Sequence, residues 1–367
     1  MEQSPVKKKR KKIMMVIWIC LAVAVLGLIA AVLYGNYRTK QLATMSYEEM
    51  LAYDTKNDPN ARITVGVLQN GKASYTVYGQ NGTVLPEAQH TYEIGSLTKT
   101  FTAALIARGV QEGKIDLQNR IDAYLPLPEG QNYPTVSQLL THTSGYRSYY
   151  FEAPMTANTL GGKNTFYQVT RGMVLDRLSR IRRAERAYPF SYSNFGFAVL
   201  GLILEEVYQR DYTALINAYV QDTLGLANTR VSDGRGDLGR YWDWAQNDAY
   251  IPAGALLSNA EDMLRYAALQ MDGEHAALTM CQRKLADIEP IGFYTHIGIG
   301  MNGVGMSWML DEANHIVWHN GGTSYYNSYL GFDPQRGIAV AVLSNLPPNQ
   351  KIPATVIGPK LLAGLQG

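Results

Sequence analysis

The chain contains only two cysteines, and this scarcity excludes two ways of stabilising a fold. Cys20 lies inside an apolar run, so Cys281 has no partner in the rest of the chain. A disulfide framework and a cysteine-based zinc site are therefore excluded. A His-Glu-x-x-His motif is absent too, and the three β-forming residues between His315 and His319 would hold these two rings far apart. We expect neither a metal ion nor another cofactor.

Positive charge is also scarce outside one short segment. Six of the 33 Lys and Arg residues lie at positions 7–12, whereas Asp and Glu number 31. Beyond residue 12 the chain keeps 27 basic and 30 acidic residues, a net charge of −3. A nucleic-acid-binding protein concentrates positive charge on its folded domain. We therefore expect no nucleic-acid partner.

The segment at 13–34, IMMVIWICLAVAVLGLIAAVLY, contains no charged residue. As a helix rising about 1.5 Å per residue it would reach roughly 33 Å, enough to span a hydrocarbon core. A cleaved signal peptide has an apolar stretch of only about 7–15 residues that ends in small residues, whereas this run ends in Leu33 and Tyr34. We therefore expect a retained transmembrane helix. The basic tail at 1–12 should remain cytoplasmic, which predicts a single-pass protein of the cell membrane with its remaining residues extracytoplasmic.

The composition after this run is that of a folded domain. Hydrophobic residues make up 46% of the chain and charged residues 17%, which supplies enough apolar material for a sizeable core. Residues 35–60 are polar and are interpreted as a stalk or lead-in, where Ser46 and Glu49 have capping-box spacing before a short helix. We assign residues 61–367 to one two-lobed domain.

Secondary-structure patterns place β-strands at both ends of this domain. Asn70-Gly71 between two β-rich runs predicts a hairpin at 62–79. Helical spacing of apolar residues predicts a buried helix at 96–112, and the middle of the domain, 117–285, reads as mostly helical. Further elements are predicted as helices at 195–208, 260–269 and 354–365 and as strands at 304–310, 315–319, 328–332 and 338–344. Both ends of the domain should therefore contribute to one sheet.

The segment YEIGSLTKTFTA at 92–103 offers a candidate nucleophile. Ser96 and Lys99 are three residues apart at the start of an apolar helix, so their side chains share one helix face. A serine needs a neighbour that takes its proton, and burial at the positive end of a helix pushes a lysine towards its neutral form. The spacing alone is weak, because Ser4 and Lys7 match it too and a serine N-cap is the ordinary alternative. The Gly-x-Ser-x-Gly signature of α/β-hydrolases is absent.

Two further motifs give the pair a context, Tyr192-Ser193-Asn194 and His319-Asn320-Gly321. Together with the serine and lysine they form the three-part pattern of penicillin-recognising serine hydrolases. The chain resembles the class C β-lactamase and D-alanyl-D-alanine carboxypeptidase family, a penicillin-binding protein-like family that includes esterases and D-aminopeptidases. The flanking segments agree, among them LLTHTSGY at 139–146 and PAGALLSNAEDMLRY at 252–266, and the resemblance covers about residues 60–350.

The resemblance implies a fold and a set of roles. The fold would be of class α/β (α+β type), β-lactamase/transpeptidase-like, with an antiparallel sheet flanked by helices plus a mostly helical lobe. Ser96 would attack a carbonyl and form an acyl-enzyme, with Lys99 as its proton acceptor or electrostatic partner. Tyr192 would be kept partly ionised by Lys99 and would relay protons. Asn194 would bind the substrate amide, and the backbone N–H groups of Ser96 and Gly322 would form the oxyanion hole.

The third motif departs from the pattern of class C β-lactamases, which have Lys-Thr-Gly where this chain has His319, Asn320 and Gly321. Histidine is mostly neutral near pH 7, so a substrate carboxylate would lose a permanent partner. We expect substrate binding by His319 to strengthen as the pH falls through about 6.5. His142 in THTSG is interpreted as structural, hydrogen-bonded to the backbone.

The sequence thus predicts a membrane-anchored extracytoplasmic serine hydrolase that forms an acyl-enzyme on Ser96. Its substrate would be a peptide, amide or ester, with D-amino-acid peptides of the cell wall favoured. Two alternatives stay open. One is a sensor of β-lactams or peptidoglycan that deacylates slowly, and the other is a true β-lactamase.

Overall fold

The computed structural model describes residues 40–86, 89–289, 292–349 and 351–367, together with Met14, Trp18 and Gly35. The predicted tail at 1–12, and the membrane segment at 13–34 apart from Met14 and Trp18, lie outside the described residues. Among the residues that are described, no helix is both long and apolar enough to cross a membrane. The chain divides into two compact units, Met1–Met45 and Ser46–Gly367, and the larger one contains the sheets.

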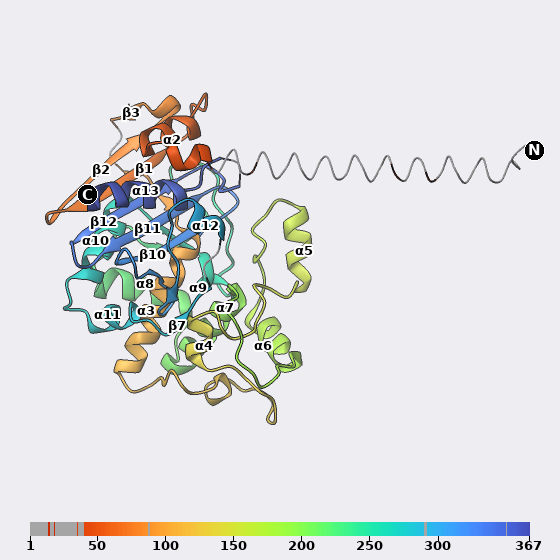
Figure 1. Ribbon diagram of the computed structural model, residues 1–367. Coiled ribbons are helices and arrows are strands. Elements are labelled where there is room, and N and C mark those ends of the chain that lie inside the picture. Colours follow the sequence, from red (N-terminus) through yellow and green to blue (C-terminus); the bar gives the residue numbers. More distant parts are fainter. Residues whose placement is uncertain are drawn as a thin grey trace, which may run out of the picture. The chain divides into compact units, whose positions relative to one another are not determined.

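Two antiparallel sheets form the framework of the larger unit (Figure 1). The first has nine strands in the order β3-β2-β1-β12-β11-β10-β9-β8-β7, and the second has three in the order β4-β6-β5. The nine-stranded sheet consists of β1 (Ile63–Gln69), β2 (Lys72–Tyr78), β3 (Val84–Leu85), β7 (Ala286–Asp287), β8 (Gly303–Val304), β9 (Met309–Asp311), β10 (Ile316–Gly322), β11 (Asn327–Asp333) and β12 (Ile338–Ser344). The three-stranded sheet consists of β4 (Tyr92–Glu93), β5 (Arg230–Val231) and β6 (Leu256–Ser258). Strands β1 and β12 pair side by side, which confirms that both ends of the domain contribute to one sheet.

Helices occupy the middle and the end of the unit. They are α2 (Tyr47–Asp54), α3 (Thr98–Gln111), α4 (Val136–Leu140), α5 (Ala153–Leu160), α6 (Arg171–Arg180), α7 (Asn194–Tyr208), α8 (Tyr212–Ala218), α9 (Ile251–Gly254), α10 (Ala260–Met271), α11 (Ala276–Cys281), α12 (Gly292–His296) and α13 (Ala354–Gln366). The helices predicted at 195–208, 260–269 and 354–365 are confirmed as α7, α10 and α13.

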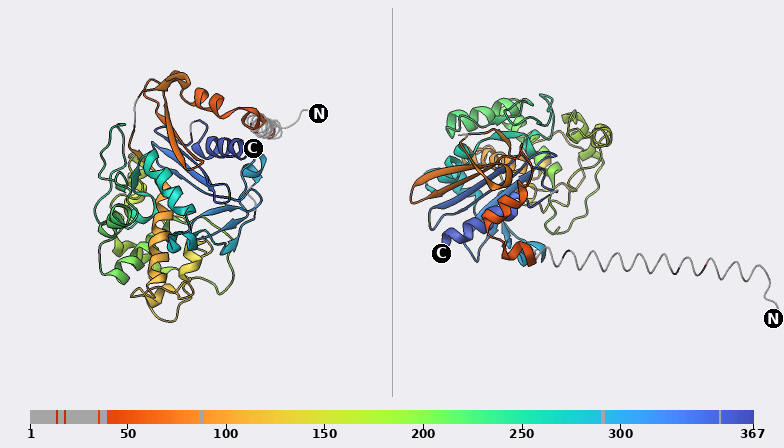
Figure 2. Two further views of the ribbon diagram at one scale, coloured as in Figure 1. Left: turned by 90° about the vertical axis from the view of Figure 1, so that its left-hand side faces the viewer. Right: turned by 90° about the horizontal axis from the view of Figure 1, so that it is seen from above.

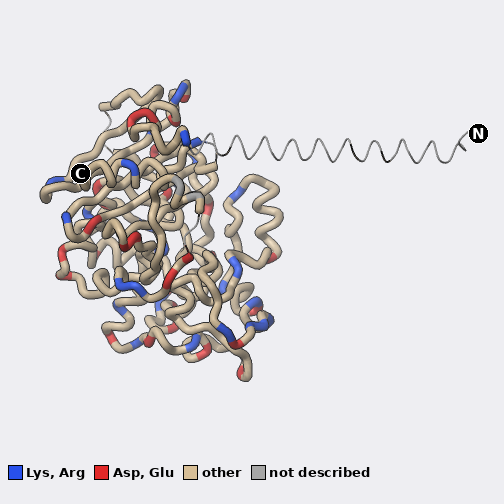
Figure 3. Tube along the Cα trace, in the orientation of Figure 1, with Lys and Arg blue, Asp and Glu red and all other residues tan. Residues whose placement is uncertain are grey.

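Charged residues of both signs are interspersed along the trace in view in Figure 3.

Helices α10 and α13 cover opposite faces of the nine-stranded sheet. A side chain at Gly66 would meet Leu264 of α10, whereas Tyr329 lies against Gly358 of α13. The strand register aligns Gly66, through β12, with Leu330, the neighbour of Tyr329. Because consecutive residues of a strand point to opposite faces, the two helices must lie on opposite sides of the sheet, as the left view of Figure 2 shows. All residues of β11 and β12 are accordingly buried.

The strand predicted at 304–310 is wrong as a single element. Strand β8 ends at Val304 and β9 begins at Met309, because the chain turns between them. The turn is closed by a hydrogen bond of 2.9 Å from the amide of Gly305 to the carbonyl of Trp308. Ser307 within it has a φ of +72°. The alternation of the sequence gave no sign of this left-handed residue.

The second half of the predicted lead-in is part of the larger unit. Ser46 and Glu49 form the expected capping box at the start of α2. Met50 and Leu51 of this helix are buried, and the carboxylate of Asp54 at its end accepts a hydrogen bond of 2.8 Å from the amide of Ile352. This helix thus packs with the C-terminal part of the domain.

Candidate active site

Ser96 lies in a single 3₁₀ turn, Gly95–Leu97, that joins β4 to α3. Gly95 has a φ of +50°, a conformation that glycine adopts without strain. A Cβ atom at Gly95 would come within 2.6 Å of the amide nitrogen of Gly322 at the end of β10. Glycine at this position thus lets β10 approach the nucleophile loop closely, which places the Gly322 backbone next to Ser96.

Lys99 lies in the first turn of α3 and is fully buried. Its Nζ is 2.9 Å from the Oγ of Ser96 and 2.5 Å from the carbonyl oxygen of Ala253 at the end of α9. Among the described residues no carboxylate forms an ion pair with it. Burial therefore lowers the pKa of Lys99 well below its usual value. Burial thus favours the neutral amine, within hydrogen-bond distance of a serine hydroxyl, the arrangement that proton abstraction requires.

Tyr192 stands beside this pair. The Nζ of Lys99 lies 5.0 Å from the centroid of the tyrosine ring. The phenol oxygen is buried and makes no hydrogen bond of ordinary geometry to the residues that the structure describes. Burial raises the pKa of Tyr192 above its usual range, and the Ser96 side chain offsets this only in part. The resemblance implied a partly ionised Tyr192, whereas burial of this side chain favours the neutral phenol.

Two buried histidines flank Tyr192, with ring centroids 4.4 Å away for His142 and 6.3 Å away for His319. The Nδ1 of His142 accepts a hydrogen bond of 3.1 Å from the amide of Ser193, in agreement with its structural interpretation. The Nδ1 of His319 lies 2.6 Å from the carbonyl oxygen of Asn320.

The expected titration of His319 near pH 6.5 is wrong. Burial is the main cause that lowers the pKa of His319 to about 3. Only 1% of its surface is exposed. A proton on its ring would have to be buried without a carboxylate nearby, which is unfavourable. His319 is therefore a neutral part of the interior at physiological pH.

A cavity of about 270 Å³ opens beside Ser96. Strand β10 contributes Trp318, Asn320, Gly321 and Gly322 to its lining. Side chains of a strand alternate between its two faces, so Trp318 and Asn320, both in the cavity lining, share one face of β10. The ring of His319 lies 6.3 Å from that of Tyr192 and is not among the described residues that line the cavity. Sequence reasoning missed Asn320. Asn320 could have been found from the alternation of side chains along β10, because it lies two residues before Gly322 and therefore on the same face of the strand.

The remaining cavity residues are mostly apolar and come from separate loops and strands. They are Phe190, Tyr192, Tyr294, Met301 and Met309. They come from separate segments of the chain, and among them only Tyr192 belongs to a motif identified in the sequence.

Asn194 is placed differently from its expected role. It begins α7, and its side-chain amide donates a hydrogen bond of 3.0 Å to the Oγ of Ser148. Asn194 is not among the described residues that line the cavity. The structure thus brings together Ser96, Lys99, Tyr192, His319 and the glycines of β10, and it holds Asn194 in a hydrogen bond to a neighbouring loop.

A second residue that sequence reasoning missed is Glu93, in the strand that leads to Ser96. Its buried carboxylate accepts a hydrogen bond of 2.5 Å from the hydroxyl of Thr323, the residue that follows Gly322. It also accepts one from the amide of Trp242. Burial raises the pKa of Glu93 to about 7. Glu93 thus ties the nucleophile strand to the end of β10.

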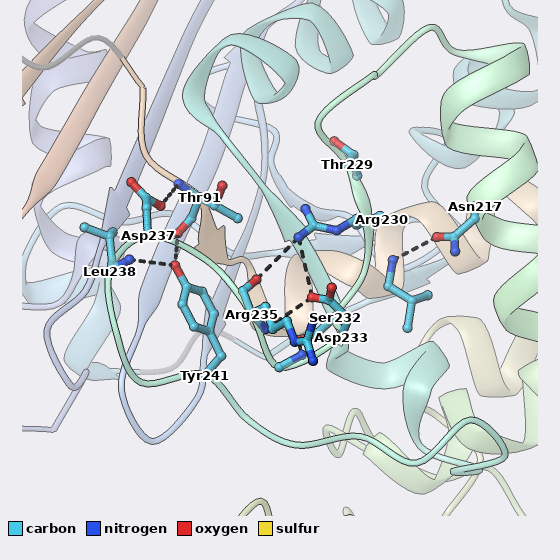
Figure 4. A network of polar contacts seen from close by, with 12 residues as sticks. Thr91, Asn217, Thr229, Arg230, Ser232, Asp233, Arg235, Asp237, Leu238 and Tyr241 are labelled. Carbon is cyan, nitrogen blue, oxygen red and sulfur yellow. Dashed lines mark hydrogen bonds and ion pairs between the residues drawn. The ribbon is translucent and has the colours of Figure 1, made fainter.

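The loop that carries Trp242 is fastened to the same strand (Figure 4). The carboxylate of Asp237 accepts a hydrogen bond of 2.9 Å from the amide of Thr91, and the hydroxyl of Tyr241 donates one of 2.7 Å to the carbonyl of Thr91. These bonds fix the backbone just before β4.

Within the described part of the chain, no three His, Cys, Asp or Glu side chains lie close enough together to hold a metal ion.

A model of the protein family described as Beta-lactamase matches residues 61–357. The chain belongs to this Beta-lactamase family. A similar curated protein is Protein flp of Staphylococcus aureus (strain N315), 23% identical over 329 residues that cover 82% of this chain and 62% of that protein. The chain thus spans about 62% of the length of this relative. A Beta-lactamase of Pseudomonas fluorescens is 24% identical over 333 residues, covering 78% of this chain and 88% of that protein.

Solved structures share the fold of this Beta-lactamase family member. A Beta-lactamase/D-alanine carboxypeptidase from Yersinia pestis superposes with a TM-score of 0.67 at 17% identity, covering 90% of this chain and 99% of that one. The octameric penicillin-binding protein homologue from Pyrococcus abyssi gives a TM-score of 0.65 at 22% identity, covering 83% and 73%. The β-lactamase/transpeptidase-like fold predicted from the sequence is confirmed.

Proposed function

We propose that this Beta-lactamase family member is a serine hydrolase that forms an acyl-enzyme on Ser96. The observation that carries the proposal is the fully buried Lys99, whose Nζ lies 2.9 Å from the Oγ of Ser96 without a carboxylate partner in the described structure. A buried, uncompensated lysine is costly to keep charged, and such groups are typical of sites where a base is needed near neutral pH.

The first half of the reaction follows from these positions. Lys99 takes the proton of Ser96 while Oγ attacks the substrate carbonyl. The developing oxyanion would be stabilised by the backbone N–H groups of Ser96 and Gly322. The Gly322 backbone closely approaches Gly95, the residue before the nucleophile. The neutral phenol of Tyr192 can protonate the leaving group and recover a proton from Lys99, so no net charge remains in the site.

In the second half water replaces the leaving group. Lys99, again neutral, can accept a proton from the water directly or through Tyr192. The tetrahedral intermediate then releases the acid and restores the Ser96 hydroxyl. Both halves use the same three side chains.

The experiment for this proposal separates an enzyme from a sensor. The protein is mixed with excess 4-nitrophenyl ester, and release of nitrophenolate is followed past one equivalent. Continued release that is lost in Ser96→Ala supports the hydrolase. One equivalent of nitrophenolate, with a lasting adduct, would instead support a slowly deacylating sensor. Absence of any release that depends on Ser96 would contradict both.

We further propose that residues 13–34 anchor the protein in the cell membrane with the hydrolase domain outside the cytoplasm. The support is the sequence, an uncharged 22-residue run behind a basic tail. Protease added to intact cells should digest the domain, and the protein should stay in the membrane fraction through high-salt washing. Soluble protein in the medium with a new N-terminus beyond Tyr34 would show a cleaved signal instead.

D-amino-acid peptides of the cell wall remain the substrate class favoured by the sequence pattern. Hydrolysis of a β-lactam is the alternative that a chromogenic cephalosporin tests.

A further inference from the structure

The cavity beside Ser96 is lined mainly by aromatic and sulfur-containing side chains. Trp318, Met301 and Met309 are at most 7% exposed and form its floor. The indole N–H of Trp318 donates a hydrogen bond of 3.0 Å to the carbonyl of Gly300, so its polar edge is already satisfied. The ring of Tyr294 meets Trp318 edge-on, with centroids 6.2 Å apart. This floor offers apolar contact surface.

The described residues that line the cavity include no charged side chain. Two buried basic groups near Tyr192 are not part of this lining. Lys99 is buried behind Ser96 with a lowered pKa. His319 is buried beside Tyr192 and is neutral near pH 7, since its pKa is about 3. Asn320 is the one lining side chain that carries an uncharged amide.

The order of these groups along β10 sets what a substrate meets. Gly322 lies at the oxyanion end, Asn320 follows two residues back and Trp318 four residues back. At a rise of about 3.3 Å per residue, Trp318 is roughly 13 Å from Gly322 along the strand. A substituent that extends from the scissile carbonyl along β10 would thus pass an amide and end on the apolar floor.

We propose that this site takes esters or amides whose substituent beside the scissile carbonyl is uncharged and apolar, rather than substrates that carry a carboxylate there. The proposal rests on the serine hydrolase function proposed above and narrows its substrate class. A carboxylate in this cavity would give up its hydration without gaining a cation or a set of donors, which is strongly unfavourable. An alkyl or aromatic group of matching size gains contact with the floor instead.

The test uses the full-length protein in detergent micelles and two matched esters. In 4-nitrophenyl hexanoate the acyl chain ends in a methyl group, and in mono-4-nitrophenyl adipate a carboxylate stands in its place. The kcat/KM values are corrected for the rate with Ser96→Ala. The hexanoate should be preferred by at least ~10-fold, the usual scale for leaving a charged group without its partner.

Two variants of the cavity assign the preference to this site. Asn320→Lys introduces a cation on the cavity face and should shift the ratio towards the adipate by at least ~10-fold. Asn320→Met has a side chain of similar length without the charge and should not shift it in that direction. Comparing the two variants cancels the intrinsic reactivity of the esters and their partition into micelles.

The outcomes separate this inference from the proposed function. Hydrolysis that depends on Ser96 but is equal for both esters, or faster for the adipate, overturns the inference and leaves the hydrolase intact. The inference is also overturned if the hexanoate is preferred but Asn320→Lys shifts the ratio no more than Asn320→Met does. The preference would then arise outside the cavity. If neither ester is hydrolysed at Ser96, the hydrolase and the inference both fail.

Discussion

The contact between β10 and the nucleophile loop predicts a large effect of one methyl group at Gly321. A Cβ atom at this position would lie 1.9 Å from the carbonyl oxygen of Ile94, whereas real Cβ atoms keep at least 3.0 Å. The strand would have to move by about 1.1 Å. The carbonyl cannot turn aside easily, because it accepts a hydrogen bond of 2.8 Å from the Oγ of Ser328.

A shift of this size displaces the Gly322 amide from the oxyanion. Hydrogen-bond donors in such sites act at about 2.7–3.1 Å, and loss of one donor typically costs ~10²–10³ in kcat. Overpacking adds a loss of ~1–3 kcal/mol in the free energy of unfolding. We therefore expect Gly321→Ala to lower the turnover of 4-nitrophenyl hexanoate by at least ~10²-fold and to lower the urea midpoint of unfolding.

Gly254→Ala is the matched control, because Gly254 also lies beside the nucleophile loop. A Cβ atom there would find its nearest neighbour, the carbonyl carbon of Gly95, at 3.8 Å, an ordinary contact. This variant should keep turnover within a few-fold of the wild type. If Gly321→Ala matches the wild type in both turnover and urea midpoint, β10 is not pressed against Ile94 as described, and the argument for the oxyanion hole loses its basis.

Two further predictions concern titratable groups. Lys99→Ala should slow acylation by at least ~10²-fold. In the wild type the acylation rate should decline only as the pH falls through the lowered pKa of Lys99, well below 10.5. A decline of the acylation rate that begins near pH 10.5 would contradict a neutral Lys99. Glu93 has a pKa raised from 4.5 to about 7, so the folded state holds its proton more tightly than the unfolded chain does. Its contribution to stability is fully present below pH 4.5 and is lost as the pH rises through about 7, by up to ~3 kcal/mol. Urea unfolding between about pH 5 and 8 should show this decline in the wild type and not in Glu93→Gln, and parallel pH dependences of the two proteins would refute it.

Local patterns were enough to predict most regular elements. The hairpin at 62–79 could be predicted because Asn70-Gly71 has a strong turn preference, and both residues adopt positive φ in the structure. The capping box at Ser46 likewise depends only on neighbours in the sequence. The turn at Ser307 escaped, since the left-handed conformation is adopted there by a serine rather than by a glycine.

Only those site residues that belong to the short motifs of the family pattern could be predicted from the sequence. Ser96 and Lys99 are three residues apart, so a helix brings them together by itself. The chemical state of Tyr192 and His319 was not predictable, because it depends on burial by segments that lie far away in the chain. Glu93 and the apolar cavity residues were missed for the same reason: their roles arise from contacts with Thr323, Trp242 and the β9–β10 strands, which only the folded chain supplies.

The most direct test of the account is the identity of the residue that becomes acylated. The full-length protein is treated with a neutral alkyl fluorophosphonate and digested, and the modified peptide is sequenced by mass spectrometry. The account predicts one adduct, on Ser96 in the segment YEIGSLTK, slower to form in Lys99→Ala and absent in Ser96→Ala. An adduct on another residue, or undiminished labelling of Ser96→Ala, would contradict the claim that Ser96 is the nucleophile.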